Sequence, residues 1–200
     1  MKTRYIAAYV LLTSMGAWPL AHSAPPIRSV GTQVTQFRST NDFVNGTNGC
    51  VGNVCVGFAA QVFDDFSGVT QAIVSASFFD LNTFQFQVIQ CSGPAYANSL
   101  FLVQGNGNAT VRATLDPSAV DCSASNVSAP IGLDLVGRAD GTFHVSNDGF
   151  FTNDFGGQII KGRSQSDQFS DTFNGTIGSV SGTFTGSVGA FRNSQLEQVK

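Results

Sequence analysis

Acid–base or nucleophilic catalysis needs side chains that this sequence supplies sparingly. It contains two histidines, His22 and His144. A Ser-His-Asp site would have to use His144 as its general base, because His22 lies in a segment expected to be removed. In the stretch GTFHVS, strand alternation places His144 opposite to Phe143 and Val145, on the solvated face. The sequence also lacks the G-x-S-x-G pattern that presents a nucleophilic serine. We therefore interpret His144 as an exposed strand residue and expect no catalytic residue.

Aspartate pairs are the second source of catalytic chemistry, because acid–base hydrolysis needs only two carboxyl groups at a suitable separation. Three pairs could supply them: Asp64 with Asp65, Asp148 with Asp154, and Asp167 with Asp171. All of them lie in or beside expected turns, where aspartate commonly caps backbone donors. A hydrolase built on an aspartate pair is therefore the last-ranked hypothesis.

The stretch 147–154 offers hard oxygen ligands, Asn147, Asp148, Asn153 and Asp154, around glycines. It lacks the ligand spacing of an EF-hand and the glycine-rich repeat of calcium-binding β-rolls. We predict a solvated loop here, with no metal and no cofactor. These four residues are candidate contacts for a ligand or a partner.

The four cysteines are Cys50, Cys55, Cys91 and Cys122. A zinc site or a redox pair fits their spacing poorly, so two disulfides are the favoured interpretation. Three pairings are open, and sequence proximity favours Cys50 with Cys55 and Cys91 with Cys122. In chain-entropy terms the Cys91–Cys122 bond contributes about 3.7 kcal/mol, which is more than the Cys50–Cys55 bond contributes.

Residues 1–23 have the pattern of a cleaved secretory signal peptide. Lys2 and Arg4 precede an apolar run from Ile6 to Leu12, and small residues follow at 21–23. The apolar run is too short for a spanning helix and no second one follows, so we expect no transmembrane segment. The predicted location is secreted or periplasmic.

The composition after residue 23 excludes some classes of binding partner. Eight cationic side chains stand against thirteen acidic ones, which argues against nucleic acid. The single tyrosine, Tyr96, and the absence of tryptophan disfavour carbohydrate recognition. Tyr96, in a Pro/Gly turn after Cys91, is a further candidate contact for an apolar small molecule or a surface partner. The eighteen phenylalanines form either a core or the lining of a cavity.

Alternating apolar residues predict strands over 54–62, 70–80, 109–115 and 131–138. The apolar set is even-numbered in 54–62 and odd-numbered in 109–115 and 131–138. The strand 70–80 has Ala72, Val74, Ala76 and Phe78 on one face and Ile73 and Phe79 on the other. A strand over 84–91 is expected to turn Phe84, Phe86 and Val88 inward. An "ADG" turn at 139–141 is expected to form a hairpin with 142–146. In the loop that follows, Phe150, Phe151 and Phe155 should fold underneath. Three late strands complete the pattern over 159–164, 168–177 and 181–191.

This pattern predicts an all-β fold, a single antiparallel β-sandwich or closed up-and-down β-barrel of about 8–10 short strands, stapled by disulfides. The expected division is a signal peptide at 1–23, an extended leader or edge strand at 24–45, one all-β domain at 46–192 and a tail at 193–200. The favoured function is an exported, non-enzymatic envelope or secreted protein with a binding or structural role. A carrier of an apolar small molecule in a Phe-lined barrel is the alternative.

Overall fold

The structure, a computed structural model, describes residues 33–50, 52–64, 69–96, 101–103 and 106–199. Ten strands form one antiparallel sheet in the order β5-β6-β8-β9-β10-β1-β2-β3-β4-β7. Their bounds are β1 Gln33–Thr47, β2 Val54–Asp64, β3 Thr70–Asp80, β4 Phe86–Ser92, β5 Phe101–Val103, β6 Ala109–Leu115, β7 Cys122–Ser125, β8 Ile131–Asp154, β9 Gln158–Ile177 and β10 Val180–Val199. The all-β prediction is confirmed. The expected signal peptide at 1–23 lies outside the described residues.

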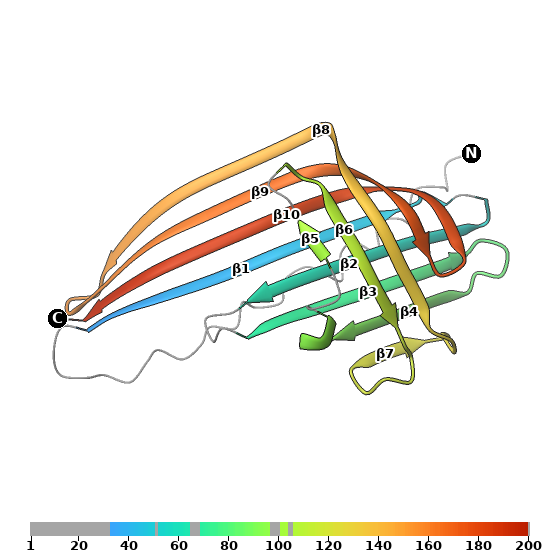
Figure 1. The fold of residues 1–200 in the computed structure, drawn as a ribbon, viewed down its shortest axis with the longest axis horizontal. Coiled ribbons are helices and arrows are strands. Elements are labelled where there is room, and N and C mark those ends of the chain that lie inside the picture. Colours follow the sequence, from blue (N-terminus) through green and yellow to red (C-terminus); the bar gives the residue numbers. More distant parts are fainter. Residues whose placement is uncertain (1–32, 51, 65–68, 97–100, 104–105, 200) are drawn as a thin grey trace.

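The sheet curls over on itself without closing. Within the described chain β5 and β7 are its two edges, so the closed barrel is not formed. The curl brings β6 over β3 and β4, and Figure 1 shows β6 and the first part of β8 crossing in front of the β2–β4 strands. A single folded sheet thus supplies both layers that enclose the core.

The core lies between these two layers. Phe58 packs edge-to-face against Phe173 and Phe184, with ring centroids 5.1 and 6.0 Å apart. Around them lie predicted apolar sets of three strands and one of the two apolar faces of β3: Val56 and Ala60 from β2, Val111 and Leu115 from β6, Ile131, Leu133 and Leu135 from β8, and Ala72, Val74 and Ala76 from β3. Full burial of one such Leu or Phe stabilises by about 1.5–3 kcal/mol. The alternation in β2, β6 and β8 therefore predicted their core-facing residues correctly, whereas β3 has apolar residues on both faces.

The predicted inward face of β4 is wrong. Ile89 and Cys91 are fully buried, whereas Phe84 and Phe86 are exposed. Register explains the difference, because Ile89 pairs with the buried Ala76 of β3, and paired residues share a face of the sheet. Alternation along β4 then turns Phe86 outward.

The predicted hairpin at 139–141 is also wrong, because β8 continues as one strand to Asp154. Its pairing with β9 shifts register between Ala139 and His144, and Gly141 there has a φ of 77°. The reversal comes instead at 155–157, with Gly156 at a φ of 76°. The loop phenylalanines are accordingly on a strand and its turn, and Phe150 and Phe155 are 77% and 66% exposed.

Four long strands extend past the core. β6 pairs with β8 only as far as Gly137, and β2 pairs with β1 only from Thr40 onwards. Beyond these points β8, β9, β10 and β1 run on together, toward the left of Figure 1. We call the part of these four strands formed by residues 33–43, 144–154, 159–169 and 189–199 the projection; β2 still borders its inner end, along residues 40–43. The stretch expected as a leader and the stretch expected as a tail thus both contribute strands.

Candidate functional site

The outer margin of the projection is a long unpaired strand edge. From residue 144 to residue 154, β8 pairs with β9 on one side, and no strand of the described chain pairs with its other side. Every residue of this stretch is exposed, and none is Lys, Arg or Pro. We call 144–154 the free edge. Half of the backbone N–H and C=O groups of such an edge point toward a position that a further strand can occupy.

One surface of the projection is charged, and we define this charged face by Asp148, Phe150, Arg163 and Arg192. Arg163 forms two hydrogen bonds to Asp148, at 2.9 and 2.5 Å. The same guanidinium lies 5.3 Å from the Phe150 ring centroid. These hydrogen bonds hold the pKa of the Asp148 carboxyl below its usual value. Arg192 forms a second ion pair, with Asp42.

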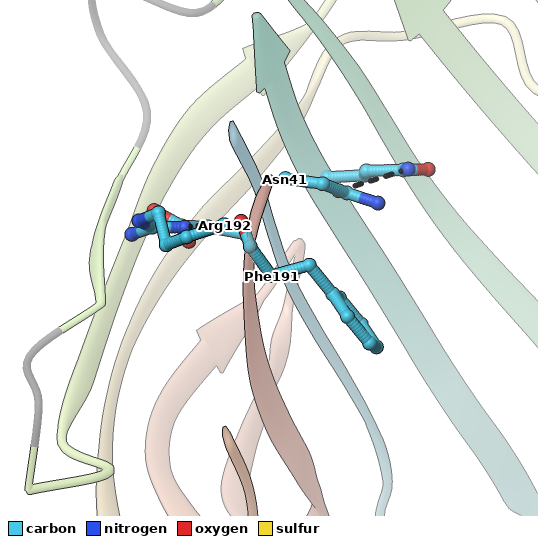
Figure 2. Close-up of polar contacts among 5 residues, drawn as sticks. Asn41, Phe191 and Arg192 are labelled. Carbon is cyan, nitrogen blue, oxygen red and sulfur yellow. Dashed lines mark hydrogen bonds and ion pairs between the residues drawn. The ribbon is translucent and has the colours of Figure 1, made fainter. Parts of the chain in front are cut away.

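The opposite surface is the aromatic face, defined by Asn41, Phe43, Phe151 and Phe191. Phe43 stacks on Phe191 with centroids 5.8 Å apart. Asn41 accepts a 3.0 Å hydrogen bond from the Gln61 amide. Figure 2 shows Asn41 and Phe191 on one side of the β1–β10 pair and Arg192 on the other. The projection is therefore a two-sided sheet with aromatic and amide groups on one side and ion pairs on the other.

The expected ligand cluster at 147–154 is divided between these two surfaces. Because successive strand residues point to opposite faces, Asp148 and Asp154 share the charged face and Asn147 and Asn153 lie on the other. Asp154 also accepts a 2.9 Å hydrogen bond from the Gly156 N–H. Among the described residues no group of three or more His, Cys, Asp or Glu could hold a metal ion.

The expected aspartate pairs do not form a shared site. Asp65 lies outside the described residues, and Asp167 contacts the edge histidine His144 at 3.3 Å. His144 itself is half exposed and stacks on Phe169, with centroids 4.1 Å apart. Asp171 is instead fully buried, with both carboxyl oxygens lacking a hydrogen-bond partner in the described structure.

Sequence reasoning missed the environment of Asp171. Burial, with a smaller contribution from the nearby Asp140 charge, raises the pKa of Asp171 to about 7. Asp140 accepts hydrogen bonds from Ser170 and from the Thr142 N–H, which lower its own pKa. The sequence did contain the signal, because Asp171 lies between Phe169 and Phe173 at two-residue spacing and so points to the same, inward face of the strand. A perturbed carboxyl pair suggests acid–base chemistry, but a side chain with no exposed surface cannot reach a substrate.

Gly137 provides the space that Asp171 and Phe173 occupy. A Cβ at position 137 would lie 2.4 Å from Phe173 Cε1 and 2.6 Å from Asp171 Oδ2. We expect Gly137→Ala to lower the free energy of unfolding by about 1–3 kcal/mol, since both neighbours are buried. Gly132→Ala, on the same strand with no atom within 4 Å of the added Cβ, is the matched control. Urea unfolding of both variants tests this, and equal losses would contradict it.

The remaining predicted contact, Tyr96, lies beside β7. The structure contains the disulfides Cys50–Cys55 and Cys91–Cys122, as sequence proximity favoured. The Tyr96 hydroxyl is 3.2 Å from the Cys122 Sγ, and burial, with the charges of two nearby aspartates, raises its pKa. An open hollow of about 570 Å³ is lined by Ala95, Tyr96, Arg112, Ala113, Thr114, Leu133 and Asp134. An exposed ion pair, Arg112 with Asp134, lies in its wall.

Comparison with known proteins shows no family. No family model matches the chain, and no curated protein matches it. The chain is similar to a solved structure described as a "putative AttH" from Nitrosomonas europaea, with 11% identity and a TM-score of 0.33. The similarity covers 80% of this chain and 51% of the other, so this chain spans about half the length of that protein. A similarity this low carries no argument about function.

Proposed function

We propose that this chain is an exported, non-enzymatic β-protein that binds an extended polypeptide strand along the free edge. The observation that carries this proposal is the unpaired side of β8 over residues 144–154. A peptide strand added there would satisfy the outward backbone groups, and its side chains would meet both surfaces of the projection. Export is supported by the pattern of residues 1–23 and by the two disulfides. In the described part of the chain, no helix is long and apolar enough to cross a membrane.

The side chains along the free edge support strand addition. Proteins usually protect long sheet edges with Lys, Pro or inward-pointing charges, or with a covering segment. The free edge has no Lys, Arg or Pro, its Asp148 is neutralised by Arg163 of the neighbouring strand, and its His144 contacts Asp167 of the same strand as Arg163. Phe150 on the charged face and Phe151 on the aromatic face are both exposed. An added strand would cover part of each ring and so remove apolar surface from water.

The two other functions have weaker support. The buried phenylalanines Phe58, Phe173 and Phe184 pack against one another, which is what a core requires. The hollow beside Tyr96 is open and is lined by charged as well as apolar groups, so it differs from the Phe-lined cavity that a carrier of apolar molecules would need. The residues proposed as partner contacts are therefore Asn147, Asp148, Asn153 and Asp154 on the free edge, with Tyr96 as a separate, secondary contact.

A synthetic peptide with the sequence of residues 144–154, HVSNDGFFTND, is the probe for strand addition. We expect saturable binding to the purified mature chain in fluorescence anisotropy, with hydrogen-exchange protection confined to 144–154. The same peptide with proline at its positions 147 and 149 should not bind, because it lacks two donors. Absence of binding by the unmodified peptide, or protection elsewhere in the chain, would refute the proposal.

A substitution on the free edge tests the location of the peptide. We expect Val145→Lys to weaken peptide binding by about tenfold, since a charged side chain on an edge strand opposes pairing. Val136→Lys is the matched control: both valines lie on β8 and are 48% and 45% exposed, but Val136 is paired with Thr110 of β6. Equal effects of the two substitutions would place the peptide elsewhere.

The non-enzymatic part of the proposal has its own test. Metal-free mature protein is assayed with fluorogenic ester, glycoside and phosphate substrates. We expect no turnover above that of the solution without protein. Turnover that Asp171→Asn or Asp148→Asn abolishes would show that the chain is a hydrolase.

A further inference from the structure

We infer that the strand accepted by the free edge is β8 of a second copy of this chain, paired antiparallel about a two-fold axis at Gly149. This inference rests on the proposed function, because it names the polypeptide that the free edge binds. The result is a symmetric dimer in which the two four-stranded projections form one eight-stranded sheet. Most soluble homo-oligomers have such two-fold symmetry, with the same surface patch used by both copies.

The position of the axis follows from the length of the free edge. The outer side of β8 is unpaired after Gly137, but a register shift against β9 interrupts the strand between Ala139 and His144. The regular ladder that follows, 144–154, has eleven consecutive positions, and Gly149 is the middle one. An antiparallel pairing centred on Gly149 is the single register in which all eleven residues of one copy face all eleven of the other. Any shift would leave backbone donors and acceptors unpaired at both ends.

The side chains are complementary in this register. His144 lies opposite the partner's Asp154, so an imidazole meets a carboxylate twice in the symmetric dimer. Asp148 lies opposite the partner's Phe150. Within one copy the Arg163 guanidinium already contacts both the Asp148 carboxylate and the Phe150 ring, so the new pair joins groups that this guanidinium accommodates. Like charges do not face each other directly at any of the eleven positions.

The surfaces of the two projections also match. Residues paired across antiparallel strands share a face of the sheet, so the charged face of one copy continues into the charged face of the other. The aromatic face continues in the same way, with Phe151 opposite the partner's Asn147. The symmetry therefore brings the two exposed Phe150 rings near each other around the axis and removes apolar surface from water.

The other unpaired edges of the described chain are less suited to this pairing. β5 and β7 span three and four residues, which is short for an intermolecular ladder. The outer side of β1 is unpaired over residues 33–39 and carries the exposed cation Arg38. Pairing of the free edge with that segment of another copy would be head-to-tail and would leave both ends of the assembly open. The free edge paired with itself gives a closed assembly.

A cysteine at the axis tests the register directly. Position 149 accepts a side chain, because no atom lies within 4 Å of an added Cβ. Under mild oxidation we expect Gly149→Cys to give a disulfide-linked dimer, since residues on the axis face each other. Thr152→Cys is the control: its partner copy would be six residues away along the strand, about 20 Å, beyond the reach of a disulfide. Equal crosslinking of the two variants would overturn the register.

The oligomeric state tests the inference independently of any cysteine. In sedimentation velocity we expect the mature chain to dimerise with rising concentration, Val145→Lys to weaken the dimer about tenfold, and Val136→Lys to leave it within twofold. Circular dichroism establishes that both variants are folded. A chain that stays monomeric at millimolar concentration while still binding the 144–154 peptide would overturn the dimer and leave strand addition standing. Absence of both peptide binding and dimerisation would overturn strand addition as well.

Discussion

Raising the pH from 4.5 to 8 is expected to cost the wild-type chain about 3 kcal/mol of unfolding free energy through Asp171 alone. The pKa of this carboxyl is about 7 in the folded chain, against an ordinary value of 3.8 for an aspartate in water. The difference is about three pH units, and each unit corresponds to about 1.4 kcal/mol. Below the unfolded value the group is neutral in both states. Between the two values the folded state holds the proton that the unfolded state has released, so stability falls as pH rises until the folded value is passed.

Asp171→Asn should remove this dependence, because an amide stays neutral at both pH values. At pH 4.5 the variant and the wild type should have similar stability, and at pH 8 the variant should be the more stable by several kcal/mol. Asp116→Asn is the control: Asp116 is hydrogen-bonded to Ser118, which lowers its pKa, so its effect has the opposite sign. Urea unfolding at both pH values measures all three proteins. A wild type and an Asp171→Asn variant with parallel pH profiles would contradict the burial of an unpaired carboxyl.

Removing the Cys91–Cys122 disulfide is expected to have the second large effect. The bond closes a loop with a sequence separation of 31, and Cys91 is fully buried opposite Val74 of β3. The chain-entropy term alone is about 3.7 kcal/mol, and truncation of the buried sulfur adds to it. The double variant Cys91→Ala/Cys122→Ala should therefore lose a large share of the 5–15 kcal/mol typical of a domain.

The Cys50–Cys55 disulfide provides the comparison. Its sequence separation is 5, Cys50 is exposed, and the chain-entropy term is about 2 kcal/mol. Differential scanning calorimetry of the two double variants should show the larger fall in Tm when Cys91 and Cys122 are replaced. A larger fall for the Cys50→Ala/Cys55→Ala variant would mean that the Cys50–Cys55 loop supports more of the fold than its length suggests.

Sequence patterning predicted those strands whose apolar residues occur on one side only. In β2, Val56, Phe58 and Ala60 alternate with small or polar residues, so only one of the two faces could be buried. β4 has apolar residues at both parities, with Phe86 and Val88 on one side and Ile89 and Cys91 on the other. Its own alternation could not choose between them, and the larger phenylalanine indicated the wrong face.

The candidate site was only partly predictable for a related reason. Asn147 to Asp154 contain turn-forming residues and glycine, which local preference assigns to a loop. In the structure these residues pair with 159–166 of β9, and an eleven-residue ladder outweighs local preference. The sequence therefore indicated that this stretch is exposed. That it forms an unpaired strand edge depends on where the pairing of β6 with β8 ends, at Gly137.

The sequence by itself determined the all-β class, the two disulfides and the core-facing sets of β2, β6 and the start of β8. These are local properties, because period-two alternation and cysteine proximity are visible within a few dozen residues. Tertiary structure decided the register of β4, the curl that leaves the sheet unclosed, the burial of Asp171 and the free edge at 144–154. Each of these depends on which strands become neighbours, and a strand cannot specify its neighbours through its own alternation.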